Sequence, residues 1–194
     1  MKCLVVYCHP VPESFCASLR DATVETLKTR GWDVRLIDLY AEKFDPVLSA
    51  DERRNMEHAP TDPKLAPHID NLKWAQAIVF VYPTWWYGLP AMLKGWLDRV
   101  WWTDVAFKLA PDGGRIIPLM SHITKIGIVT TCGAPWWFSF LIGQPGRKTI
   151  LRGIRALCAP CARTMYLAHY NMDQSTPESR VAYLATVKRR LAAF

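Results

Sequence analysis

Apolar runs rich in β-branched residues alternate along this chain with amphipathic helical patterns, and this alternation restricts the fold more than any other feature. The expected strands cover residues 2–8, 33–39, 77–82, 125–131 and 163–170. The expected helices cover residues 14–30, 69–75, 89–101, 149–157 and 176–191. Such alternation is typical of βαβ units with parallel strands. The sequence therefore predicts an α/β fold with a doubly wound five-stranded parallel sheet in the order 2-1-3-4-5.

Two helices carry clear local signals. In residues 89–101 large apolar residues recur every three or four positions, and Lys94 and Asp98 lie four apart on the polar side. In the last helix Thr176 is the expected N-cap and Pro177 the first helical residue. That helix is expected to bury Val181, Leu184, Val187 and Leu191. Residues 40–67 have no sustained period and predict a long excursion with at most one short helix.

A chain of 194 residues fits a single domain, here residues 1–194, that can bury a core without disulfides or metal. The six cysteines are scattered, and we expect reduced thiols. Cys158 and Cys161 have the spacing of a redox pair, but they follow an expected helix rather than a strand, which favours a structural role. No second pair with matching spacing predicts zinc. The N-terminal apolar run is too short for a signal peptide, so we expect a soluble cytoplasmic protein.

The formal charge of +7 raises the question of a nucleic-acid partner. The basic residues read as spread out rather than banded, and no nucleic-acid fold signature is present. DNA or RNA binding is therefore the less favoured alternative. The favoured interpretation is a solvated basic surface whose potential attracts an anionic dinucleotide or a flavin phosphate.

Three loops are expected at the carboxyl ends of the strands, where sheets of this type bind ligands. The first, residues 9–16, has no glycine-rich fingerprint but ends in Ser14, which caps a helix whose free amides suit a phosphate. The second holds Trp85, Trp86 and Tyr87, which predict either a platform for a flat aromatic ligand or a cap or subunit contact. The third, residues 131–138, places small residues before further aromatics.

These loops resemble the three flavin loops of the NAD(P)H:quinone reductases, a flavodoxin-like family. The likeness rests on His9-Pro10 with Ser14-Phe15, on the long motif of residues 83–100, and on Thr130-Thr131-x-Gly133. It covers about residues 1–138. The same family includes modulator-of-drug-activity proteins and the ancillary oxidoreductases of potassium efflux systems.

The resemblance implies roles for particular residues. The expected flavin-binding residues are His9, Ser14, Phe15, Cys16, Ser18, Pro83, Thr84, Trp85, Trp86, Tyr87, Thr131, Cys132 and Gly133. The expected substrate-binding residues are Trp86, Trp136, Trp137 and Phe138. Cys132 stands where the family usually has glycine, and Phe138 and Gln144 stand where the animal enzymes have tyrosine and histidine. No catalytic residue, proton donor or metal site is therefore assigned.

The resemblance also implies an activity: hydride transfer from NAD(P)H through the N5 atom of FAD or FMN, with FAD favoured, to a quinone or similar electrophile in a ping-pong mechanism. A homodimer is expected, with Trp101 and Trp102 as the candidate contact. One alternative is a flavin-binding regulatory subunit that docks on a membrane transporter. A one-electron flavodoxin carrier is disfavoured by the basic charge and by His9-Pro10.

Overall fold

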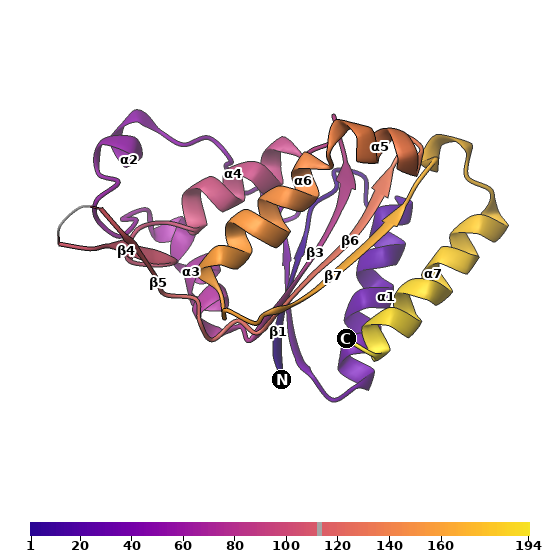
Figure 1. Ribbon diagram of the computed structural model, residues 1–194, viewed down its shortest axis with the longest axis horizontal. Coiled ribbons are helices and arrows are strands. Elements are labelled where there is room, and N and C mark those ends of the chain that lie inside the picture. The colour runs from indigo at the N-terminus through magenta and orange to yellow at the C-terminus, as the bar shows by residue number, and fades with distance from the viewer. Residues whose placement is uncertain (112–113) are drawn as a thin grey trace.

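A parallel five-stranded sheet forms the centre of the computed structural model, which describes residues 1–111 and 114–194 (Figure 1). Its strands are β1 (Lys2–Tyr7), β2 (Asp33–Asp38), β3 (Ala77–Thr84), β6 (Lys125–Cys132) and β7 (Arg163–His169). They pair in the order β2-β1-β3-β6-β7, and every pairing within this sheet is parallel. The predicted fold class and strand order are confirmed.

The central strands are buried on both faces, which explains their nearly unbroken apolar sequences. Alternate side chains of β1 and β3 enter two separate clusters. Val6 and Phe80 belong to the larger one, whereas Val5 and Val79 belong to the smaller. This two-sided burial fixes the register, because a shift of one residue would exchange the two faces.

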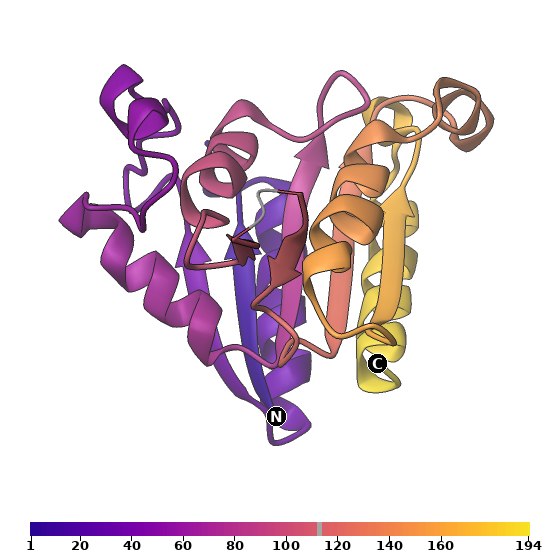
Figure 2. The same ribbon diagram turned by 60° about the vertical axis from the view of Figure 1, so that its left-hand side comes forward.

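Helices cover both faces of the sheet. One face carries α1 (Phe15–Thr29) and α7 (Pro177–Ala192), and the other carries α3 (Ala66–Trp74), α4 (Ala91–Val100) and α6 (Pro145–Lys148) (Figures 1 and 2). Thr176 caps α7 as predicted, and Lys94 donates to Asp98 at 2.5 Å on α4. The prediction for Val181 is wrong, because its side chain is 65% exposed. The buried stripe of α7 lies further along, at Val187 and Leu191.

Several short elements differ from the expected ones. The 40–67 excursion holds α2 (Ala50–Arg54) and a short η1 (Pro63–Leu65), and a hairpin of β4 (Phe107–Leu109) and β5 (Ile116–Pro118) was not expected. The helix expected at residues 149–157 is irregular. It continues from α6 as the wide turn η2 (Thr149–Gly153) and the tight turn η3 (Ile154–Leu157).

The third loop contains a helix that the sequence analysis missed, α5 (Trp136–Ile142). It ends at Gly143, whose φ of 93° is left-handed. The amide of Gly143 donates to the carbonyl of Phe140 at 2.9 Å, and the amide of Gln144 donates to the carbonyl of Ser139 at 3.1 Å. Glycine is the residue that tolerates this cap conformation.

Trp101 and Trp102 are not available as a subunit contact. Their exposed fractions are 6% and 5%, and both belong to the larger core cluster. The indole N–H of Trp102 donates to the carbonyl of His58 at 2.9 Å, so the 40–67 excursion contacts this residue. The prediction that they form the dimer contact is wrong. Among the described residues no helix is long and apolar enough to cross a membrane.

Candidate functional site

Loops from four strands surround a cavity of about 810 Å³ at the carboxyl edge of the sheet. The lining residues are His9, Pro83, Thr84, Trp85, Trp86, Tyr87, Thr131, Cys132, Gly133, Ala134, Met172 and Asp173. The structure therefore brings together every residue predicted to bind flavin from the loops after β3 and β6. It also places the cavity at the switch point between β1 and β3, where a doubly wound sheet binds its ligands.

The aromatic loop after β3 is a tight turn with a strained backbone. Trp86 and Tyr87 both have left-handed φ values, 48° and 60°. The amide of Gly88 closes the turn by donating to the carbonyl of Trp85 at 2.9 Å. Two positive φ values at the centre define a type I′ turn, which costs about 1–2 kcal/mol for each side chain other than glycine. Trp86 is 95% exposed, so its own side-chain packing does not offset this cost.

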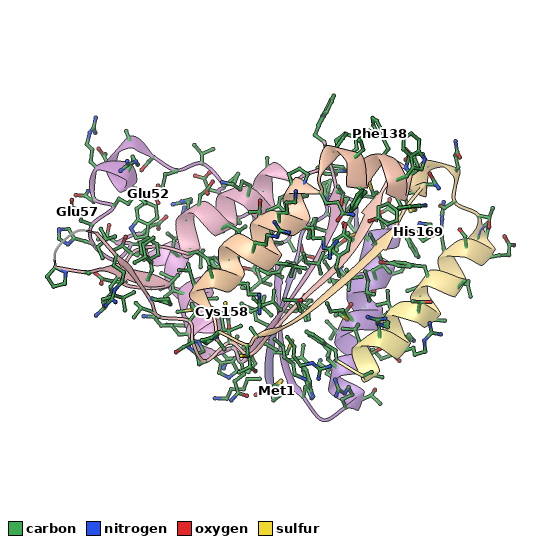
Figure 3. All side chains as sticks on the ribbon, in the orientation of Figure 1. Met1, Glu52, Glu57, Phe138, Cys158 and His169 are labelled. Atoms are coloured by element: carbon green, nitrogen blue, oxygen red, sulfur yellow. The ribbon has the colours of Figure 1, made fainter. Side chains whose placement is uncertain are left out.

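Contacts behind the turn hold it in place. The amide of Gly146, in α6, donates to the carbonyl of Tyr87 at 3.3 Å. A Cβ atom added to Gly146 would lie 3.0 Å from the carbonyl carbon of Gly88. The Phe138 ring packs edge-on against Tyr87, with centroids 5.8 Å apart. Phe138 lies on α5 at the carboxyl edge (Figure 3), where it supports the turn but is not among the lining residues.

The end of β6 forms the wall opposite the aromatic turn. The hydroxyls of Thr84 and Thr130 lie 2.9 Å apart and join the ends of β3 and β6. Cys132 is only 5% exposed, and its Sγ lies 3.5 Å from the Ser139 hydroxyl. Cys132 lines the cavity, but most of its side chain is withdrawn from solvent. A Cβ atom at Gly133 would lie 2.4 Å from the Asp173 carboxylate, so that side chain would have to move to admit a larger residue.

Met172 and Asp173, which line the cavity, lie in η4 (Met172–Gln174) just after β7. Neither residue was predicted from the sequence to belong to a site. The amide of Asn171 donates to the carbonyl of Ala134 at 3.2 Å and ties this segment to the loop after β6. The available signal was topological, because the carboxyl end of the fifth strand meets the same edge as the other four.

The first loop positions the start of α1 beside the cavity. Ser14 caps the helix, and its Oγ accepts from the amide of Ala17 at 3.2 Å. The amides of Phe15 and Cys16 precede Ala17 in the first turn, where helices have no acceptors for them. Burial raises the pKa of the Cys16 thiol, so its side chain belongs to the core. Ser14, Phe15, Cys16 and Ser18 are not lining residues of the cavity.

Three residues that the sequence analysis did not select surround Phe15. The His169 and Tyr183 rings lie 5.7 and 6.4 Å from the Phe15 ring, and the Arg180 guanidinium lies 6.0 Å from it. His169 pairs in register with the cavity residue Thr131, which joins this cluster to the cavity.

The Nδ1 atom of His169 is buried without a hydrogen-bond partner in the described part of the chain. An unpaired buried polar atom costs about 1–3 kcal/mol. Together with the amides of α1 and the Arg180 guanidinium, this atom fits a cofactor that carries phosphate groups.

The predicted substrate residues Trp136 and Trp137 lie on α5, outside the cavity lining, and are 64% and 55% exposed. His9 does line the cavity, and its Nδ1 accepts from the amide of Val11 at 3.0 Å. Burial lowers the pKa of His9, which keeps the ring neutral and makes it a poor proton donor near neutral pH. Within the described residues no cluster of three His, Cys, Asp or Glu side chains could hold a metal.

Comparison with known proteins agrees with this architecture. A family described as having the flavodoxin-like fold matches residues 1–189. NAD(P)H dehydrogenase (quinone) 1 of Rattus norvegicus is 30% identical over 214 residues, covering 98% of this chain and 76% of the rat protein. Ribosyldihydronicotinamide dehydrogenase (quinone) of Mus musculus is 33% identical over 218 residues, covering 98% of this chain and 90% of the mouse protein. The crystal structure of Smu.1420 from Streptococcus mutans UA159 superposes with a TM-score of 0.85 at 29% identity, with both chains fully covered.

Proposed function

The chain belongs to the flavodoxin-like family that contains the quinone-type NAD(P)H dehydrogenases, and from this premise we propose that it is a flavin-dependent NAD(P)H oxidoreductase acting on a quinone or similar electrophile. The observation that carries the proposal is the 810 Å³ cavity between the strained aromatic turn and the end of β6. Strained backbone at the rim of a cavity is typical of sites that must present their backbone groups in a fixed arrangement.

Particular residues would hold the flavin. Backbone groups of Thr84–Tyr87 would meet one edge of its ring system, and those of Thr131–Gly133 the other, where donors stabilise negative charge. The amides of Phe15 and Cys16 would bind its phosphate. A bound flavin supplies the hydride chemistry, and the protein supplies position and electrostatics.

FAD is the favoured cofactor. The free amides at the start of α1 would bind a single phosphate group. His169 and Arg180 add a second group of possible donors around Phe15. A guanidinium and an imidazole near a helix start suit a pyrophosphate better than one phosphate group. Chromatography of the flavin released from the denatured protein tests this choice, since recovery of FMN alone would contradict it.

A single cavity between the aromatic turn and the β6 end supports alternating occupancy by nicotinamide and quinone. Two flat rings cannot occupy the same position, so the first product must leave before the second substrate binds. Steady-state rates measured at several quinone concentrations should give parallel double-reciprocal lines, and intersecting lines would contradict the mechanism. A flavin-loaded protein that oxidises no NAD(P)H with any quinone would instead favour a regulatory flavoprotein.

We also propose a homodimer, now with a different contact. The β4–β5 hairpin exposes Leu109, Ile116 and Ile117, with exposed fractions of 50%, 54% and 36%. A second copy that covered these side chains would remove apolar surface from water. Light scattering at micromolar concentration should give twice the monomer mass, and a fully active monomer would contradict this proposal. All six cysteines are free thiols, which supports the proposed cytoplasmic location.

A further inference from the structure

Helix α5 turns most of its apolar side chains outward. In this helix of seven residues Ser139 is the buried one, while Trp136, Phe140 and Leu141 are 64%, 70% and 73% exposed. Trp137 and Ile142 are exposed as well. Soluble proteins seldom present so many large apolar side chains on one short element without a binding partner. Figure 1 shows α5 above the carboxyl ends of the strands, directly before α6.

A basic groove adjoins this helix. It has a volume of about 480 Å³ and runs along α6, η2 and η3. Its lining residues are Phe140, Gly143, Gln144, Arg147, Lys148, Leu151, Arg152, Arg155 and Thr164. Four of these are cations and none is acidic, and in the described part of the chain none of the four forms an ion pair. The groove is therefore a site of uncompensated positive charge.

The charge of the whole chain is concentrated in the same region. Residues 114–172 contain seven of the 24 Lys and Arg and none of the 17 Asp and Glu, so they account for the full formal charge of +7. The basic residues are no denser here than in the rest of the chain, so the excess charge of this region comes from its lack of acidic residues. Four of the seven cations line the groove, directly beyond the exposed apolar side chains of α5.

We infer that α5 and the basic groove bind the surface of an anionic phospholipid bilayer. Exposed Trp, Phe and Leu side chains beside Lys and Arg are the combination that inserts into the headgroup region and holds anionic lipids there. A helix of seven residues is about 10 Å long, so it lies within the interface and does not span the bilayer.

Charge complementarity favours this partner over a second copy of the chain. A two-fold symmetric interface with α5 on its axis brings the same surface of both subunits together. If α5 formed such an interface, the uncompensated cations of one groove would lie near those of the other, which is unfavourable. Nucleic acid would complement the cations, but it would leave the exposed side chains of Phe140 and Leu141 without an apolar environment.

Docking through α5 also indicates a class of substrate, and this step rests on the proposed function. Ala134 lines the cavity two residues before α5 begins, and Trp86 lines it from the opposite loop. Binding of α5 to a bilayer would therefore bring the cavity rim to the lipid surface. A quinone dissolved in the membrane would then reach the cavity without crossing water, so we infer a lipid-soluble quinone as acceptor.

Sedimentation of the flavin-loaded protein with vesicles tests the docking surface. We expect binding to vesicles of equal parts phosphatidylglycerol and phosphatidylcholine, and little binding to phosphatidylcholine alone. The K148Q/R152Q variant should bind the anionic vesicles about 30-fold more weakly, roughly fivefold for each cation. The F140S/L141S variant should bind at least about 100-fold more weakly. Control variants elsewhere on the surface, K73Q/R189Q with the same charge change and V47S/V181S with exposed apolar residues replaced by serine, should bind like the unaltered protein.

Three results would overturn the inference: no binding of the unaltered protein to anionic vesicles, equal loss in the control variants, or loss of dimer mass in F140S/L141S with unchanged vesicle binding. The last result would assign α5 to an interface between copies. Vesicle binding does not require turnover, and flavin absorbance reports the cofactor site separately. Failure of the docking surface is therefore distinguishable from failure of the proposed function.

With that function established, vesicle-bound protein should reduce a membrane-dissolved quinone faster than K148Q/R152Q does. Both proteins should reduce a water-soluble quinone equally, and equal rates with the membrane-dissolved quinone would contradict the substrate class.

Discussion

Replacing Trp86 by glycine should stabilise the protein while it weakens flavin binding. Trp86 has a left-handed φ of 48° and is 95% exposed, so the folded chain holds strain there with little packing in return. Glycine adopts this conformation without a steric penalty. The indole, in contrast, lines the cavity that we assign to the flavin and its substrates.

The magnitude follows from two opposing effects. A left-handed residue other than glycine costs about 1–2 kcal/mol, whereas the greater freedom of glycine in the unfolded chain costs about 0.5–1 kcal/mol. The difference lies between about 0 and 1.5 kcal/mol, so W86G should raise the free energy of unfolding by roughly 0.7 kcal/mol, which corresponds to a Tm increase of about 1–3 °C for a chain of this size.

Urea and thermal unfolding should be measured on protein stripped of flavin, because bound cofactor itself adds stability. W86A removes the indole but keeps the strain, so it should lose flavin affinity without the gain in stability. K43G relieves a similar left-handed residue, φ 52°, far along the chain from the cavity loops, and should gain stability with unchanged flavin binding. The reasoning is refuted if W86G is no more stable than W86A, or if W86G retains flavin like the unaltered protein.

Three further predictions concern the parts that surround the cavity. S14D should abolish flavin retention on gel filtration yet leave stability unchanged, because aspartate still caps α1 but repels a phosphate; unchanged retention would place the phosphate elsewhere. G146A should shorten the residence time of bound flavin several-fold, because the new Cβ would displace the turn at Gly88. G153A places its Cβ in open space and should leave the residence time unchanged. Equal residence times in both variants would contradict the support of the turn by Gly146. Burial lowers the pKa of His9 and His68 below the usual 6.5, so the unfolded chain takes up protons first and stability should fall as pH drops below about 6.5. H68Q should reduce the dependence of the free energy of unfolding on pH, as measured by urea titrations. An unchanged dependence on pH would contradict the role of His68.

The sequence predicted those features whose signals are local. Within a few residues, an unbroken apolar run indicates strand β3 and apolar residues spaced by three and four indicate helix α4. Thr176 likewise indicates the start of α7. The aromatic loop after β3 could be predicted to line the cavity because three consecutive aromatic residues cannot all enter the core.

The features that sequence reasoning missed depend on distant parts of the chain. Trp102 is buried because the 40–67 excursion folds over it and offers the carbonyl of His58. Helix α5 has a run of aromatic residues with no helical period, and its clearest signal is the cap at Gly143. Arg180 reaches Phe15 because α1 and α7 pack side by side on the same face of the sheet, whereas His169 reaches it from the end of β7.

Anaerobic titration of the purified protein, followed by visible absorption, tests the central claim most directly. We expect the absorption bands of a bound oxidised flavin, bleaching on addition of NADH or NADPH, and recovery of the bands when a quinone is added. A protein that shows no flavin bands, even after incubation with FAD and FMN, would contradict the account, as would a bound flavin that neither nicotinamide reduces.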